Sequence, residues 1–126
     1  MNDFDIPIFK KSYELHKTFY LYRASVSKQD RYTIWQRGEN LIIDILEGIL
    51  LASQLPKEPK LPVLERVSAK LNLLRIFLRL AKDVKALDQK KYIALEEMVD
   101  EVGRMLGGWI RSTYGAVAKM PTESEH

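Results

Sequence analysis

The segment "DEVGRMLGGWIRST", residues 100–113, has the apolar spacing of a helix but contains three glycines. A glycine inside a helix costs roughly 0.5 to 1 kcal/mol relative to alanine, because its backbone loses more conformational freedom on folding. At roughly 100° per residue, the apolar side chains from Leu95 to Ile110 fall on one arc, which is typical of a helix that faces a core. Gly103 and Gly107 lie together beside that arc. We therefore predict a helix and interpret these two glycines as a groove where another helix approaches closely.

The rest of the chain has the length and composition of one domain. With 126 residues it can bury a core unaided, and its lack of cysteine excludes disulfides and thiolate metal sites. The N-terminal stretch "MNDFDIPIFKK" has no long apolar run behind a basic start, so we expect no secretory signal. The longest apolar run, "GILLA", is too short to span a bilayer, which needs ~20 residues. We expect a soluble, cytoplasmic protein with no membrane partner.

Four segments have helical periodicity, and none has the pattern of a strand. The expected helices span about 7–25, 31–55, 63–87 and 89–114, with Asp30 and Asp88 as N-caps of the second and fourth. The segment "PKEPKLP", residues 56–62, contains three of the five prolines and is predicted to be a non-helical linker. Short connections within each pair of helices predict an all-α, antiparallel up-and-down four-helix bundle over residues 1–115. Residues 116–126 lose the periodicity and are predicted to form a flexible tail.

The third helix carries more apolar residues than one core face requires. One face is formed by Leu64, Val67, Leu71, Leu74, Leu78 and Ala81. A second stripe, formed by Leu73, Ile76 and Leu80, lies well around the helix. Because an exposed strip of Leu and Ile favours aggregation, we predict that another subunit covers it. The predicted oligomer interface is this stripe together with Gly103 and Gly107.

No constellation in the sequence points to catalysis, a cofactor or a small-molecule substrate. The two histidines, His16 and His126, lack a second ligand at metal-binding spacing, so we expect no metal site. Acidic residues near the start of the fourth helix are explained by the positive end of the helix dipole. Phosphate-binding glycine loops, dinucleotide fingerprints and nucleophile elbows are absent. We expect a protein that is not an enzyme and holds no cofactor.

Positive charge is concentrated in one part of the chain. The formal net charge is +3, but from Lys57 to Lys91 ten Lys/Arg stand against four Asp/Glu. Rows of cations on a helix suit phosphate oxygens and act through charge, without reading bases. The candidate nucleic-acid-binding residues are Arg66, Lys70, Arg75, Arg79, Lys82, Arg104 and Arg111. We expect Arg75 and Arg79 to lack acidic partners within their helix; an ordinary solvated helix face is the alternative.

The segment "LLRIFLRLAKDVKALDQKKYIALEEMVDEVGRMLGGWIRS", residues 73–112, resembles the C-terminal half of the accessory variability determinant (Avd) proteins of diversity-generating retroelements. These proteins belong to a wider four-helix-bundle family that includes ribosomal RNA intervening-sequence proteins. The specific element is "EVGRMLGGWIRS", with its glycines, Arg104, Trp109 and Arg111. The N-terminal half is similar to the family more loosely, through "LHKTFY" and "DRYTIWQRGEN".

The resemblance implies a pentameric barrel of four-helix bundles with a basic surface. It also implies binding to template RNA or its cDNA and to the reverse transcriptase of the retroelement, in support of mutagenic copying into a variable target gene. The alternative is a bundle of the ribosomal RNA intervening-sequence type, which acts as a structural or interaction oligomer. A neighbouring reverse transcriptase gene with template and variable repeats would favour the first function. An intervening sequence in a ribosomal RNA gene would favour the second.

Overall fold

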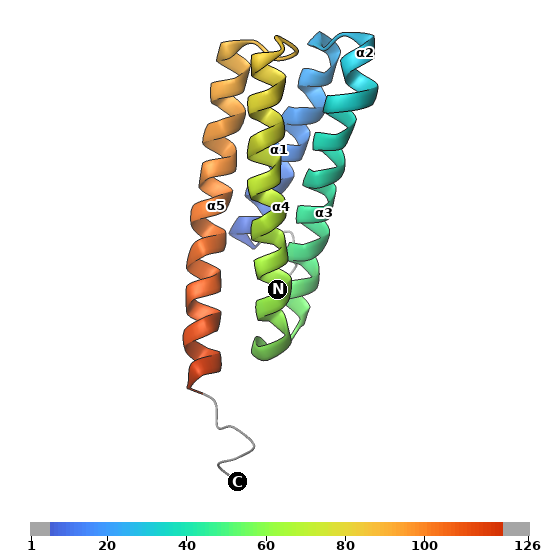
Figure 1. Ribbon diagram of the computed structural model, residues 1–126. Helices are drawn as coiled ribbons and strands as arrows, with labels where there is room; N and C mark the ends of the chain where they lie inside the picture. The colour runs from blue at the N-terminus through green and yellow to red at the C-terminus, as the bar shows by residue number, and fades with distance from the viewer. Residues whose placement is uncertain (1–5, 120–126) are drawn as a thin grey trace.

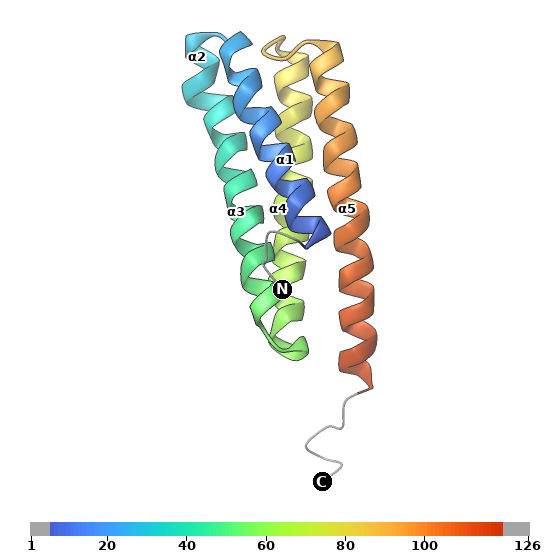
Figure 2. The same cartoon turned by 180° about the vertical axis from the view of Figure 1, so that it is seen from behind.

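The computed structural model describes residues 6–119, which form four helical rods and contain no strand (Figure 1). The rods are α1 (Pro7–Tyr22) with the 3-10 turn η2 (Arg23–Ser25); α2 (Lys28–Asp30), the π-helical turn η3 (Arg31–Trp35) and α3 (Gln36–Gln54) in unbroken succession; α4 (Lys57–Asp83); and α5 (Gln89–Ala118). Both α1 and α4 contact α3 and α5, so successive rods are antiparallel neighbours. The predicted all-α bundle is confirmed. Seen from behind, α5 continues past the start of α1 (Figure 2).

The core is one continuous cluster of aliphatic side chains along the bundle axis. The six residues predicted for the inner face of α4 are all buried. From α5, Leu95, Val99, Val102 and Leu106 enter the same cluster at helical spacing. Full burial of each large aliphatic side chain contributes roughly 1.5 to 3 kcal/mol, so the whole cluster, which α1 and α3 also enter, is the main source of stabilisation. No helix in residues 6–119 is both long enough and apolar enough to cross a membrane.

Trp35, the largest fully buried side chain, joins the first rod to the second. Its ring stacks on Phe19 with centroids 3.9 Å apart, and its Nε1–H donates to the Phe19 backbone oxygen at 3.1 Å. In a regular α-helix the Arg23 N–H would donate to the Phe19 oxygen. It donates to the Tyr20 oxygen instead, so the Phe19 oxygen is a helix-terminal carbonyl that needs a partner outside the helix. Gly38 leaves room for the stack, since a Cβ there would lie 2.7 Å from Phe19 Cζ. Trp35 therefore caps α1 and holds it against α3.

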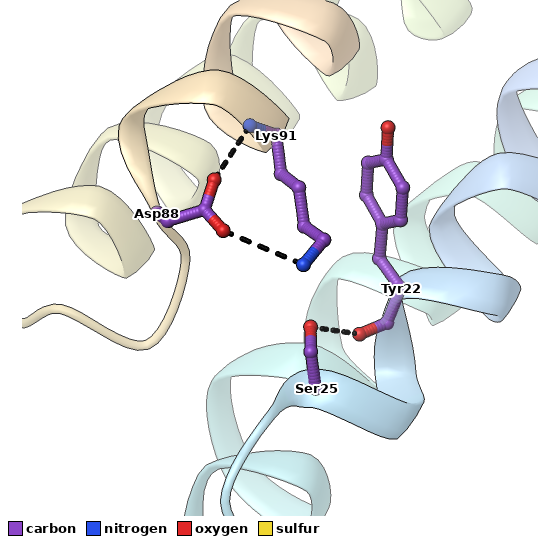
Figure 3. Close-up of polar contacts among 4 residues, drawn as sticks. All are labelled: Tyr22, Ser25, Asp88 and Lys91. Carbon is purple, nitrogen blue, oxygen red and sulfur yellow. Dashed lines mark hydrogen bonds and ion pairs between the residues drawn. The ribbon is translucent and has the colours of Figure 1, made fainter.

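The N-cap of α5 is Asp88, as predicted. Its carboxylate accepts a hydrogen bond from the Lys91 N–H at 2.8 Å (Figure 3). This bond is the main reason that the pKa of Asp88 lies below its usual value. The Lys91 ammonium lies between the second Asp88 oxygen and the ring of Tyr22, while Ser25 Oγ donates to the Tyr22 backbone oxygen. These contacts tie the start of α5 to the end of α1.

The second rod begins earlier than predicted, because Ser27 and not Asp30 is its N-cap. Ser27 Oγ accepts from the Asp30 N–H at 3.3 Å and donates to the Asp30 carboxylate at 3.0 Å. The Ser27 hydroxyl thus accepts from one free N–H at the helix start and donates to the carboxylate of the same residue. The rod then passes through η3, which the apolar spacing did not predict.

The predicted non-helical linker over residues 56–62 is wrong, because α4 begins at Lys57. Pro56 is the N-cap and Pro59 lies in the first turn, where backbone N–H groups have no partner within the helix. Pro62 removes one hydrogen bond further along, at an exposed position. The same prolines that indicate a turn are therefore compatible with the start of a helix.

The ends of α4 and α5 also differ from their predicted positions. Helix α4 ends at Asp83, not Leu87, because Lys85 has a positive φ of 64° and the N–H groups of Ala86 and Leu87 both donate to the Ala81 oxygen. Helix α5 continues to Ala118, so residues 116–118 of the predicted tail are helical. Small helix-forming side chains extend the backbone hydrogen bonding there. Lys119 follows as a turn, and residues 120–126 of the predicted tail, including His126, lie outside the described residues.

We predict that Gly48 is required for the packing of α3 on α4. A Cβ at Gly48 would collide with Val67 Cγ2, and Val67 is buried and restricted in χ1. Gly48→Ala should lower the free energy of unfolding by about 1 to 3 kcal/mol, measured by chemical denaturation. Gly108→Ala is the matched control, because only the Arg111 guanidinium, at 4.0 Å, lies near its Cβ position. The control should stabilise by roughly 0.4 to 1 kcal/mol, and a similar gain from Gly48→Ala would contradict this packing.

Candidate nucleic-acid interface

A surface groove of about 370 Å³ runs between α4 and α5. We call it the α4–α5 groove; it is lined by Ser68, Leu71, Asn72 and Arg75 of α4 and by Asp100, Gly103, Arg104, Leu106 and Gly107 of α5. It brings together two of the predicted phosphate-binding arginines and both of the glycines predicted to form a groove. These two predictions from the sequence therefore concern the same place on the surface.

Arg75 reaches across the groove from α4 to α5. Its Nη1 donates to Asp100 Oδ1 at 2.9 Å, and the two side chains are 35% and 48% exposed. Gly103 makes room for this arginine, since a Cβ there would lie 2.6 Å from Arg75 Nη2. An ion pair exposed to this degree contributes no more than about 1 kcal/mol. A phosphate can therefore replace Asp100 as the partner of Arg75 at small cost.

Within the described chain, side chains and not the backbone of another helix lie nearest to Gly103 and Gly107. The nearest atoms to a Cβ at Gly103 belong to the side chains of Arg75 and Leu71. At Gly107 the nearest atom is Nη1 of Arg111, on the same helix, at 3.3 Å. Contact of these glycines with a second subunit stays a prediction. The glycines that pack closely within the chain are Gly38, against Phe19, and Gly48, against Val67.

Three further predicted cations border the α4–α5 groove. Arg79 Nε lies 3.6 Å from Asp83 Oδ2, so the expectation that it lacks an acidic partner in its helix is wrong. Lys82 Nζ lies 4.7 Å from the ring centroid of Tyr92 in α5. Arg111 places its guanidinium beside Gly107. Together with Arg75 and Arg104, these side chains make a basic border along one edge of the bundle, which we call the basic edge.

Arg66 and Lys70 lie in a different groove, on the other side of α4. This α3–α4 groove of about 260 Å³ also contains Asp44 and Glu47, and Lys70 Nζ lies 3.1 Å from Asp44 Oδ2. Two acidic and two basic side chains face each other, so the groove has no excess of positive charge. Of the seven predicted cations, five therefore lie on the basic edge. The other two lie in the α3–α4 groove, where two acids balance their charge.

The predicted apolar stripe is only partly exposed. Ile76 is 63% and Leu80 41% exposed on the outer face of α4, as expected. Leu73 is half-buried and packs against the core, because the bundle core is wide enough to include it. The uncovered part of the stripe is therefore Ile76 and Leu80.

Tyr92 connects the basic edge to acidic side chains at the start of α5. Burial raises the pKa of its hydroxyl, and the hydrogen bond and negative charge of Glu96 raise it further. Tyr92 and Glu96 are four residues apart on α5, a spacing that places both side chains on one face of the helix and could have indicated this contact. Within residues 6–119 there is no group of three or more His, Cys, Asp or Glu side chains placed to hold a metal ion.

Comparison with known proteins gives one family match. A family model described as bAvd-like matches residues 7–113, from the first residue of α1 to Thr113 in α5. The matched range includes the whole α4–α5 groove and all five residues of the basic edge. No curated protein matches the chain.

We predict that Tyr92 titrates above the ordinary tyrosine pKa of 10.0, because burial disfavours the phenolate. NMR of the tyrosine ring resonances against pH measures this value. Glu96→Gln should lower the pKa of Tyr92, because it removes the negative charge beside the hydroxyl. An unchanged or higher pKa in this variant would contradict the contact with Glu96.

Proposed function

The chain belongs to the bAvd-like family of accessory variability determinant proteins, and from this premise we propose that it is a non-enzymatic accessory protein of a diversity-generating retroelement. In this role it binds the template RNA or its cDNA and the reverse transcriptase of the retroelement, in the cytoplasm, and supports mutagenic retrohoming. The family match over residues 7–113 carries the proposal.

The basic edge supports the nucleic-acid part of the proposal. Its five cations lie along α4 and α5, and only Asp83 and Asp100 form ion pairs with them among the described residues. Positive charge in excess of its partners attracts phosphate oxygens regardless of sequence. Arg75 is well placed for a phosphate contact, because its position over Gly103 holds the guanidinium at the groove surface.

The alternative, a structural oligomer of the ribosomal RNA intervening-sequence type, shares the bundle fold. The bAvd-like match favours the retroelement function over this alternative. A reverse transcriptase gene with template and variable repeats beside the gene for this chain distinguishes the two. Such a neighbour also identifies the polymerase to test as a partner.

The uncovered apolar residues on α4 support assembly of several subunits. Ile76 and Leu80 lie on the outer face of α4, between the two grooves, where no other part of the described chain covers them. The resemblance to Avd proteins makes the proposed assembly a homopentameric barrel. In that barrel Ile76 and Leu80 contact a neighbouring subunit, with Leu73 at the buried margin of the contact.

We predict that the purified protein is a homo-oligomer, because isolated subunits would expose Ile76 and Leu80 to water. Light scattering at micromolar concentration should give a mass several times that of one chain, with five the expected number. Ile76→Ser should lower this mass, whereas Ile93→Ser, a matched change at an exposed isoleucine of α5, should leave it unchanged. A monomeric wild-type protein would contradict the proposed assembly.

We predict salt-dependent binding of single-stranded RNA along the basic edge. Arg75→Ala with Arg104→Ala should weaken binding and reduce the slope of log K against log salt by about 0.7 for each lost phosphate contact. Arg66→Ala with Lys70→Ala removes the same number of cations from the α3–α4 groove and is the matched control. Fluorescence anisotropy across a salt series measures both pairs. An equal loss in the two pairs would contradict the assignment to the basic edge.

A further inference from the structure

A second polar hollow lies at the start of the second rod, away from the α4–α5 groove. Its volume is about 210 Å³, and it opens beside η3. Two cations, two side-chain amides, an aromatic ring and an acid line it: Arg23, Arg31, Gln36, Asn40, Tyr32 and Glu39. The buried indole of Trp35 also contributes to its wall. Neither the basic edge nor the apolar stripe includes any of these residues.

Glu39 is the unusual member of this hollow. Its Oε2 atom is buried and accepts no hydrogen bond, although two arginines line the same hollow. Arg31 instead donates from Nε to the Val26 backbone oxygen at 2.9 Å, and no ion pair joins either arginine to Glu39 in residues 6–119. A buried carboxylate oxygen without a donor is unfavourable, and such atoms are rare in folded proteins. The Glu39 carboxylate therefore has an unused acceptor at the wall of the hollow, and it must turn toward the opening to meet a donor supplied by a ligand.

The backbone of η3 presents the aromatic wall of the hollow. π-Helical turns are rare and are found frequently at functional sites. Here the turn ends in the buried Trp35 and leaves Tyr32 59% exposed, with the Arg23 guanidinium carbon 5.7 Å from its ring centroid. An exposed ring beside an arginine is the arrangement on which the bases of single strands stack.

We propose that this hollow binds one unpaired guanine of a single-stranded nucleic acid, an inference that rests on the proposed nucleic-acid binding. The hollow is smaller than the ~300 Å³ at which ordinary ligand pockets begin, so it fits one ring system and not a whole nucleotide. Tyr32 stacks on the base. The Glu39 carboxylate accepts hydrogen bonds from the adjacent N1–H and N2–H groups of guanine, the base that presents two such donors side by side.

The neighbouring surface fits the rest of the strand. An adjoining hollow of about 310 Å³ is lined by Tyr20, Leu21 and Ala24 and shares Arg23 and Arg31 with the first. A phosphate that links two nucleotides in adjacent hollows would therefore meet both guanidinium groups, which bind phosphate oxygens well. The two hollows together offer a strand a phosphate contact and a preference for one base.

Anisotropy with labelled short oligouridines tests the inference. One probe contains uridine only, a second has a single central guanosine, and a third has inosine, which lacks the N2 amino group, at the same position. The guanosine probe should bind about tenfold more tightly than the uridine probe, the gain expected from a hydrogen bond to a charged group. The inosine probe should lose most of this gain.

Three variants test whether Glu39 and Tyr32 form the guanine site. Glu39→Gln should reduce the preference for guanosine, measured as the ratio of the guanosine and uridine affinities within that variant, to less than about twofold. Glu47→Gln, the same change on the same helix but in the α3–α4 groove, should keep the full preference. Tyr32→Ala should weaken binding of all three probes by about fivefold or more, through loss of stacking.

The outcomes separate this inference from the proposed function. If wild type binds the guanosine and uridine probes equally, the guanine site is overturned while nucleic-acid binding stands. A full preference in Glu39→Gln also overturns the site. If none of the probes binds, both the site and the proposed nucleic-acid binding are overturned.

Discussion

The buried indole of Trp35 ties the first helix to the second, and the local structure on both sides of it follows from that contact. Its Nε1–H completes the hydrogen bonding of the Phe19 oxygen at the end of α1, while its ring stacks on Phe19 over Gly38. The backbone that leads to Trp35 passes through the π-helical turn η3. The outer side of that turn forms the hollow with Tyr32 and Glu39, so an anchor in the core and a surface site share one segment.

Helix α4 separates two grooves of different electrostatic character. On its α5 side, Gly103 gives Arg75 space to lie across the groove and pair with Asp100. On its α3 side, Lys70 and Arg66 face Asp44 and Glu47, and the charges balance. The exposed apolar residues of α4 lie between the two grooves. One helix thus supplies the proposed nucleic-acid surface and the proposed subunit contact on different faces.

Periodicity predicted the buried faces of single helices, but it missed the Ser27 cap and the pair of Arg79 with Asp83 within them. The inner face of α4 and the Asp88 cap follow from spacing and local hydrogen bonding, and both agree with the structure. Features that need a second helix were missed, among them the pair of Arg75 with Asp100 and the contact of Gly48 with Val67. The turn η3, a local change of backbone within the second rod, was missed as well. The linker prediction was wrong for a different reason, since prolines are tolerated in the first turn of a helix as well as in a loop.

Photocrosslinking most directly tests whether this bundle binds nucleic acid along α4 and α5. RNA that contains 4-thiouridine would be irradiated in complex with the full-length protein, and the crosslinked peptides identified by mass spectrometry. We expect crosslinks in residues 72–82 and 100–111, which border the α4–α5 groove, and none in residues 44–51 of the α3–α4 groove. Crosslinks confined to residues 44–51 and 63–70 would contradict the assignment of nucleic-acid binding to the basic edge.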